Sequence, residues 1–191
     1  MRKLKLQVQI SVDGFIAGPQ GEMDWLVQNW GPDIDASVSE LTDSVDTVLL
    51  GANLAKGFIP HWTAASKEEN PIPGAEFYAN VSKVVFSNSI QESDTEVQAW
   101  QNTSIANGNL VEEVKALKAL AGKDMIAYGG SAFVSSLIQH QLIDELYLFV
   151  NPTALGKGLP IFASLTKNQH LQLIDTKQFD CGIVLLAYKI S

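Results

Sequence analysis

Two adjacent glycines, Gly129 and Gly130, follow a short apolar run and precede a helical pattern in the segment 124–133. A strand that turns sharply into a helix leaves free backbone N–H groups at the helix start, and such groups bind anions. Ser131 adds a hydroxyl group there, and Ala132 adds a further N–H. The pattern indicates a cradle for the phosphates of a nucleotide cofactor. A plain tight turn also explains the glycine pair, because the segment lacks the Gly-x-Gly-x-x-Gly spacing of a dinucleotide site.

Three further segments place turn residues directly after an apolar run. They are 11–18, with Asp13-Gly14 and Ala17-Gly18; 46–52, which ends in Gly51-Ala52; and 142–162, which contains Asn151-Pro152 and Leu155-Gly-Lys-Gly. Asp-Gly and Ala-Gly-Pro are also common turn sequences, so a purely structural role for these glycines stays open.

Periodic apolar patterns predict the elements that position these segments. Strands are expected near residues 4–12, 46–51, 83–87, 103–106, 124–128, 143–151, 170–178 and 182–190. Helices are expected at 32–43, 109–121 and 131–140, with a short helix after Gly51. Either Asn107 or Asn109 is suited to cap the helix at 109–121. Residues 60–73 show no periodicity and are expected to form a polar loop.

The alternation of strands and helices favours an α/β fold with a mostly parallel sheet that is covered on both faces. The last two strands follow each other directly through Phe179-Asp-Cys-Gly182, which predicts an antiparallel hairpin at one edge of the sheet. Residues 1–191 contain no repeat and no long linker, so we expect a single domain.

The composition narrows the possible classes of function. The chain has 191 residues, of which 46% are hydrophobic, and a formal net charge of −8. Such a charge repels nucleic acid, so an anionic cofactor must be held by local dipoles. No apolar run is long enough to cross a membrane, and one cysteine, Cys181, forms no disulfide framework; both favour a cytoplasmic protein. The three histidines lack ligand-spaced partners, so no metal site is expected.

Taken in chain order, these four motifs resemble the dihydrofolate reductase-like superfamily, most closely the reductase domain of bacterial riboflavin biosynthesis proteins and related uncharacterised dihydrofolate reductase family proteins. The resemblance implies a three-layer α/β/α fold that binds NADPH along the carboxyl edge of the sheet. It also implies hydride transfer to a pteridine- or pyrimidine-like ring, a homodimer formed near the terminal hairpin, and a cis peptide bond between Gly129 and Gly130.

The same resemblance assigns roles to individual residues. It implies that the loop with Asp13 reaches over the nicotinamide and that Asp35 is the substrate-binding carboxylate beside Trp30. Asp35 and Asp13 are therefore the candidate catalytic residues. Asp33 competes with Asp35, and a helix-start aspartate that only favours the helix dipole is an open alternative. The implied cofactor-binding residues are Ala17, Gly18, Gly51, Ala52, Asn53, Ser87, Asn88, Gly129, Gly130, Ser131 and Ala132.

The chain departs from this family pattern at two positions. The family commonly has arginines after strands two and three, where they grip the 2′-phosphate of NADPH, but this chain has Ala52 and Asn88. Each missing arginine removes a bidentate, charge-assisted hydrogen bond to the 2′-phosphate. Its loss should weaken the preference for NADPH over NADH by about 1–3 kcal/mol. Lys56 or Lys83 are possible substitutes. NADPH is therefore the expected cofactor, with NADH as an alternative.

The leading interpretation is an NAD(P)H-dependent reductase of a small pteridine-, pyrimidine- or carbonyl-type substrate. It would resemble dihydrofolate reductase or 5-amino-6-(5-phosphoribosylamino)uracil reductase. A non-catalytic nucleotide- or pterin-binding protein on the same scaffold is the alternative, and a structural dimer with an empty cleft is a third. The resemblance does not identify the physiological substrate.

Overall fold

An eight-stranded sheet is the centre of the computed structural model, which describes residues 1–190. Its strands are β1 (Leu4–Ser11), β3 (Val45–Gly51), β4 (Ser82–Phe86), β5 (Thr103–Ala106), β6 (Asp124–Tyr128), β7 (Glu145–Asn151), β9 (Leu171–Gln178) and β10 (Val184–Ile190). Their order across the sheet is β5-β4-β3-β6-β1-β7-β10-β9. The first six of these run parallel, and β10 runs antiparallel to both of its neighbours, β7 and β9. The predicted α/β class and terminal hairpin are confirmed.

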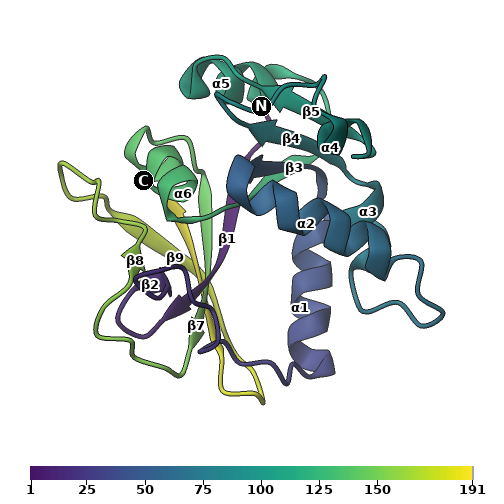
Figure 1. The fold of residues 1–191 in the computed structure, drawn as a ribbon. Coiled ribbons are helices and arrows are strands. Elements are labelled where there is room, and N and C mark those ends of the chain that lie inside the picture. The colour runs from purple at the N-terminus through teal and green to yellow at the C-terminus, as the bar shows by residue number, and fades with distance from the viewer. Residues whose placement is uncertain (191) are drawn as a thin grey trace.

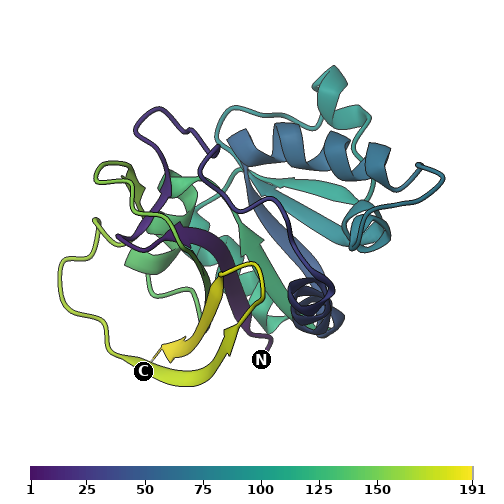
Figure 2. The same cartoon turned by 90° about the horizontal axis from the view of Figure 1, so that it is seen from below.

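Helices cover both faces of the sheet (Figures 1 and 2). On one face lie α5 (Leu110–Ala119) and α6 (Ser131–Gln139), whose buried side chains join the cluster formed by the even-numbered residues of β1. On the other face lie α1 (Pro32–Asp43) and α2 (Ala52–Ala65), which pack on two separate apolar clusters. Two short helices, α3 (Ala75–Asn80) and α4 (Thr95–Gln98), complete the set. Three layers result, as the resemblance implies.

Local chemistry explains where α5 begins. The side chain of Asn109 accepts hydrogen bonds from the backbone N–H groups of Val111 (3.0 Å) and Glu112 (3.3 Å). These bonds satisfy two of the N–H groups that a helix start leaves free. Asn109 rather than Asn107 is therefore the cap.

The helix α2 corrects one sequence prediction. We expected a short helix after Gly51 and a loop from residue 60, but α2 continues to Ala65 with Pro60 inside it. Burial of Ile59 and contacts of the Phe58 and Trp62 rings with Tyr78 hold this region in place. Tertiary packing therefore outweighs the polar, aperiodic sequence beyond residue 60.

A second, two-stranded sheet joins distant parts of the chain. It pairs β2 (Phe15–Ala17) with β8 (Leu159–Pro160), neither of which the sequence pattern predicts. A Cβ atom on Gly158 would collide with the carbonyl oxygen of Ala17, so glycine allows the two strands to approach. The loop after β1 is thus attached to the segment that follows β7. No helix within residues 1–190 is long and apolar enough to cross a bilayer.

Candidate functional site

Most of the predicted cofactor residues share one edge of the main sheet. Strands β4, β3, β6 and β1 are parallel neighbours, so their carboxyl ends meet at that edge. Leu50 pairs with Tyr128 and Gly51 pairs with Phe86, so the turns after β3, β4 and β6 lie next to one another. The residues brought to this edge are Gly51, Ala52, Asn53, Ser87, Asn88, Gly129, Gly130, Ser131 and Ala132. Ala17 and Gly18 lie at the end of β2, which pairs with β8, and the Pro160 carbonyl of β8 accepts a hydrogen bond from Ser131.

The start of α6 presents free backbone donors at this edge. No side chain caps the helix, and the first amide of this turn to find a backbone acceptor is Val134, which donates to Gly130 at 3.2 Å. Within residues 1–190, the N–H groups of Ser131, Ala132 and Phe133 have no acceptor. A Cβ atom on Gly130 would have no heavy atom within 4 Å. Three donors without an acceptor therefore lie next to the open space at Gly130, at the positive end of a helix dipole, which suits an anion.

The peptide bond between Gly129 and Gly130 corrects the family-based expectation. Residues 1–190 contain no cis peptide bond, so this bond is trans. Gly130 has an extended backbone, with φ −71° and ψ 169°, and the strand turns into α6 from there. The trans form avoids the cost of about 3–4 kcal/mol that a cis bond without proline carries.

A second uncapped helix start lies beside the first. Gly51 precedes α2, and no side chain caps that helix. Because β3 and β6 are adjacent and parallel, the amino ends of α2 and α6 flank the same part of the edge. Two positive helix ends side by side favour a ligand that carries more than one negative charge.

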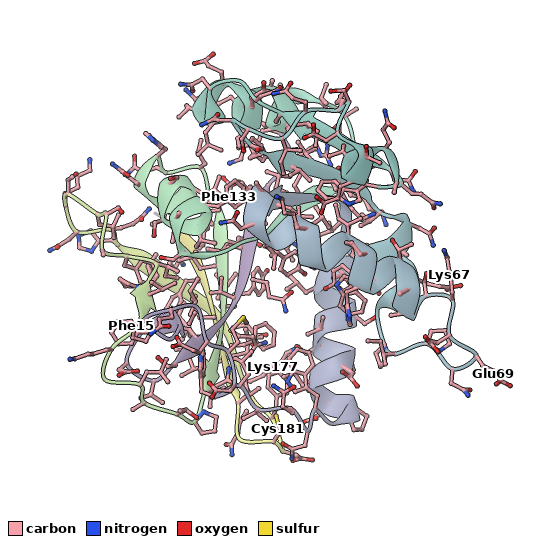
Figure 3. The ribbon with its side chains drawn as sticks, viewed as in Figure 1. Phe15, Lys67, Glu69, Phe133, Lys177 and Cys181 are labelled. Atoms are coloured by element: carbon pink, nitrogen blue, oxygen red, sulfur yellow. The ribbon has the colours of Figure 1, made fainter. Side chains whose placement is uncertain are left out.

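Phe133 lies between these two helix starts and was given no role by the sequence analysis (Figure 3). A Cβ atom on Gly51 would lie 2.9 Å from its Cβ, and one on Gly129 would lie 2.6 Å from its Cδ1. Its ring also packs on Phe86, with ring centroids 5.4 Å apart. Gly51 and Gly129 are therefore required for packing against this ring, independently of any ligand.

The remaining predicted cofactor residues differ in how free their side chains are. The Ser131 hydroxyl donates to the carbonyl oxygen of Pro160 at 2.6 Å, which ties α6 to β8. The buried Ser87 hydroxyl accepts from the N–H groups of Ser89 and Ile90 and shapes the turn after β4. Asn53 and Asn88 are exposed and make no side-chain hydrogen bond to residues 1–190. Among the predicted cofactor residues, these two asparagines offer unengaged polar side chains at the edge.

The cations do not replace the missing arginines. Arg2 is the only arginine of the sequence, and it binds Asp46, Thr47 and the Lys123 carbonyl at the opposite, amino edge of the sheet. Lys83 also lies at the amino end of its strand, where its Nζ donates to the carbonyl oxygens of Ala79 and Val81. Burial lowers the pKa of Lys83 to about 8.

Lys83 is therefore excluded as a substitute for the phosphate-binding arginines by its position at the amino edge. Lys56 is exposed on the second turn of α2, near the carboxyl edge. It is the one of the two suggested lysines that the fold leaves available.

Asp13 is held by hydrogen bonds from its surroundings. Its carboxylate accepts from the Ser11 hydroxyl at 2.7 Å and from the N–H groups of Leu155 and Gly156. These donors favour the charged form and lower the pKa of Asp13 to about 2. The Asp13 carboxylate therefore stays ionised at neutral pH, which makes it a poor proton donor. It also anchors the loop after β1 to the segment around residue 155.

The candidate substrate residues lie at and before the start of α1. The carboxylate of Asp33 accepts from the N–H of Asp180 at 2.8 Å, and this bond lowers its pKa and fixes the terminal hairpin. Asp35 is half-buried, and its side chain makes no hydrogen bond within residues 1–190. Asp35 is therefore the freer of the two carboxylates.

Trp30 lines a pocket of about 200 Å³ together with Gln9, Leu26, Val27 and Gln28. Its indole N–H donates to the Val27 carbonyl at 3.1 Å, so the ring is fixed to its own loop. Asp35 is not among the residues that line this pocket. The structure thus places Trp30 and Gln9, rather than Asp35, in the pocket wall.

Comparison with known proteins shows the family and the fold of the chain. The family model described as the RibD C-terminal domain matches residues 2–185. Uncharacterized protein YyaP of Bacillus subtilis (strain 168) is 32% identical over 190 residues, which cover 98% of this chain and 94% of that protein.

Two solved structures show the same fold. The deaminase/5-amino-6-(5-phosphoribosylamino)uracil reductase of Thermotoga maritima superposes with a TM-score of 0.68 at 20% identity, over 100% of this chain and 57% of that one. Dihydrofolate reductase from Enterococcus faecalis, complexed with NADP(H), superposes with a TM-score of 0.57 at 16% identity, over 99% of this chain and 96% of that one.

Proposed function

Because the chain belongs to the RibD C-terminal domain family, we propose that it is an NAD(P)H-dependent reductase that transfers hydride to a small pteridine-, pyrimidine- or carbonyl-type substrate. The observation that carries this proposal is the pair of uncapped helix starts at the carboxyl edge, with three free N–H groups and open space at Gly130. The named relatives support the class of reaction, since one is a uracil-type reductase and another is a dihydrofolate reductase bound to NADP(H).

The residues at this edge fit the pyrophosphate of a dinucleotide but not the 2′-phosphate of NADPH. The N–H groups of Ser131, Ala132 and Phe133 would hold the pyrophosphate, and Asn53 and Asn88 offer polar groups for the ribose or adenine. A bound dihydronicotinamide supplies the hydride itself. The protein positions the two partners and excludes water, which is the larger part of its contribution.

Asp35 is the proposed source of the proton that accompanies hydride transfer. It is the half-buried carboxylate of α1 that no hydrogen bond engages, whereas Asp13 is held ionised with its pKa lowered to about 2. A carboxylate beside a ring can hold an N–H pair of the substrate or donate a proton if it is protonated. Because Asp35 does not line the pocket of Trp30 and Gln9, this role requires the substrate to extend beyond that pocket toward α1.

The proposal is tested first by cofactor binding. Purified protein is titrated with NADPH and with NADH while dihydronicotinamide fluorescence is followed. Binding of at least one nucleotide in the micromolar range or tighter is expected. Absence of binding by both would contradict the proposed cofactor site and favour a structural protein with an empty cleft.

Turnover then separates an enzyme from a binding protein. Dihydrofolate, a reducible pyrimidine and a simple aldehyde are offered with the bound nucleotide, and its oxidation is followed by absorbance. Asp35→Asn should lower kcat by about 10²-fold or more while nucleotide affinity is kept. Asp43→Asn, an exposed position at the end of the same helix, is the matched control. Equal losses in the two variants would remove the role of Asp35.

A non-catalytic nucleotide- or pterin-binding protein is the second candidate. The observation that favours it is the position of Arg2, the only arginine, at the opposite edge of the sheet. Nucleotide binding without oxidation by any substrate of the panel would select this alternative.

A further inference from the structure

A strip of polar side chains runs along the middle of the sheet on the face covered by α1 and α2. Strand β1 is central, and its apolar residues Leu4, Leu6, Val8 and Ile10 all join the cluster under α5 and α6. Lys5, Gln7 and Gln9 alternate with them and face the other side. Parallel strands that are buried on both faces are usually apolar throughout. This strand is therefore an exception that requires an explanation.

The strip divides the apolar core of that face in two. One cluster, which includes Leu50 and Ile126, packs with α2, and another, which includes Phe149 and Ile34, packs with α1. No residue of β1 belongs to either cluster. Burying polar groups between apolar clusters is costly unless they are hydrogen-bonded, so the partners of these glutamines are informative.

Asn151 fixes the orientation of the Gln9 amide. Asn151 is fully buried; its Oδ1 accepts from the Val27 N–H at 3.0 Å, and its Nδ2 donates to the Phe149 carbonyl at 3.1 Å. Both partners are backbone groups of fixed polarity, so the Asn151 amide can adopt only one orientation. Its Nδ2 also donates to Gln9 at 2.8 Å, so Gln9 must accept through Oε1.

The Nε2 group of Gln9 is therefore left as a donor. It makes no hydrogen bond within residues 1–190. It is also not one of the fully buried polar atoms there without a hydrogen-bond partner, so it remains accessible from outside. Gln9 lines the pocket of about 200 Å³ that Trp30 also lines. This volume is below the about 300–1,000 Å³ of pockets that enclose drug-sized ligands, so it suits a single small ring system.

Gln7, two residues before Gln9 on the same face of β1, also accepts through Oε1 and, within residues 1–190, keeps a free Nε2 donor. Tyr128 donates its hydroxyl proton to Gln7 Oε1 at 2.7 Å and lies 2.8 Å from the Tyr78 hydroxyl. A hydroxyl has one proton, so in this arrangement Tyr78 donates to Tyr128. The Nε2 of Gln7 has no acceptor within residues 1–190. Tyr128 directly precedes Gly129, so the polar strip reaches the turn that leads to the glycine cradle.

We propose that Gln9 is a specificity-determining residue of the reductase site, and that its Nε2 group donates a hydrogen bond to an exocyclic oxo oxygen at the edge of the substrate ring. Asn151 is the positioning residue that turns this donor into the pocket. A ring with an amino group at the same edge is rejected, because two donors then face each other and the Gln9 amide N–H is left unpaired at the covered pocket wall. This inference rests on the proposed function, since it concerns the substrate side of that site.

The test uses two probes that differ only at the ring edge. Pteridine-2,4-dione presents oxo acceptors where 2,4-diaminopteridine presents amino donors. Their affinities for the full-length protein are measured by calorimetry at neutral pH. The unaltered protein should bind the dione at least about tenfold more tightly.

Two substitutions at Gln9 examine the polarity of the contact. Gln9→Met keeps the length of the side chain and should reduce the affinity ratio to near one. Gln9→Glu still accepts from Asn151 but presents an acceptor to the pocket, so it should reverse the preference toward the diamino probe. Asn151→Asp should also reverse it, because Gln9 must then donate to residue 151 and turn its Oε1 outward. Gln172→Glu, an exposed change of equal charge on β9, should leave the ratio unaltered.

The outcomes separate this inference from the proposed function. Equal affinities in the unaltered protein, a preference that survives Gln9→Met, or failure of both probes to bind would each overturn it. Melting curves verify that each variant is folded, and loss of stability alone does not reverse a ratio. Nucleotide titrations on the same samples report on the cofactor site separately. Normal NADPH binding without discrimination between the probes refutes only the role of Gln9. Discrimination between the probes without nucleotide binding refutes only the proposed reductase function.

Discussion

Asp13 and Asp33 carry carboxylates whose pKa values are lowered by hydrogen-bond donors rather than by cations. The Ser11 hydroxyl and two backbone N–H groups act on Asp13, and the Asp180 N–H acts on Asp33. The contacts with the backbone N–H groups join segments more than 140 residues apart in the sequence. These aspartates thus fasten loops around the candidate site, and Asp35 is the half-buried carboxylate of α1 that no hydrogen bond within residues 1–190 engages.

The anchoring role of Asp13 predicts a dependence of stability on acid. Its pKa falls from an ordinary value of 3.8 to about 2 in the folded chain. The stabilisation is therefore present above pH 3.8 and is lost as the pH falls through about 2. Asp13→Asn should show a smaller decrease in the free energy of unfolding over that interval, as measured by urea titrations at several pH values. Asp24→Asn, an exposed carboxylate, is the control; identical pH profiles for Asp13→Asn and the unaltered protein would contradict the assignment.

Gly130 provides a direct test of the cradle. A Cβ atom there meets nothing within 4 Å, and its extended backbone accepts any residue, so Gly130→Val should fold normally. The added methyl groups would occupy the space in front of the free N–H groups of α6. Nucleotide affinity should fall by more than about tenfold in fluorescence titrations. Gly57→Val fills similarly open space on α2 and should leave binding intact; unchanged affinity of Gly130→Val would move the cofactor elsewhere.

At the scale of elements, we expect the turns after β3 and β4 to decide cofactor preference. They lie side by side, because Gly51 pairs with Phe86, yet they present Ala52 and Asn88 instead of arginines. We expect NADH and NADPH to bind within about tenfold of each other, a difference below about 1.4 kcal/mol. Ala52→Arg with Asn88→Arg should favour NADPH and make its binding more sensitive to salt.

Titrations of both nucleotides at low and high salt measure this preference. Strong selectivity for NADPH in the unaltered protein would show that another cation holds the phosphate. Lys56→Met would then be the first substitution to examine, because Lys56 is exposed on α2 whereas Lys83 lies at the amino edge.

At the scale of the whole molecule, we expect the outer strand β9 to bear the predicted dimer contact. It ends the sheet and exposes Leu171, Leu173 and Ile174. The pairing with β10 passes from Asp175 directly to Leu173, so Ile174 forms a bulge that interrupts the regular edge. An apolar edge strand of this kind attracts a second chain unless it is covered.

Charge placed on this strand should therefore keep the protein monomeric. Leu173→Lys combined with Ile174→Lys is expected to shift the sedimentation coefficient from that of a dimer to that of a monomer. Met23→Lys changes a side chain that is 51% exposed, as Leu173 is, and should have no effect. A monomer in the unaltered protein, or a dimer that persists in the double variant, would refute the contact.

The sequence by itself determined the fold class, most elements and the location of the candidate site. The periods of strands and helices indicate which side chains are buried. Asn109 caps α5 and the 179–182 turn forms the terminal hairpin through residues only a few positions away. The glycine pair could be placed at the edge because the carboxyl ends of parallel strands necessarily meet there. Local sequence patterns were therefore enough to predict those features whose contacts are between near neighbours or follow from the order of the strands.

Only the tertiary structure decided which side chains line the candidate site and which of their polar groups remain free. Phe133 fills the space beside Gly51 and Gly129, Arg2 is fixed at the far edge, and α2 extends beyond Pro60 over the Tyr78 ring. The orientation of Gln9 depends on Asn151, 142 residues further along the chain. Such contacts join residues whose spacing in the sequence carries no period, so only the folded arrangement reveals which polar groups are satisfied and which remain free for a ligand.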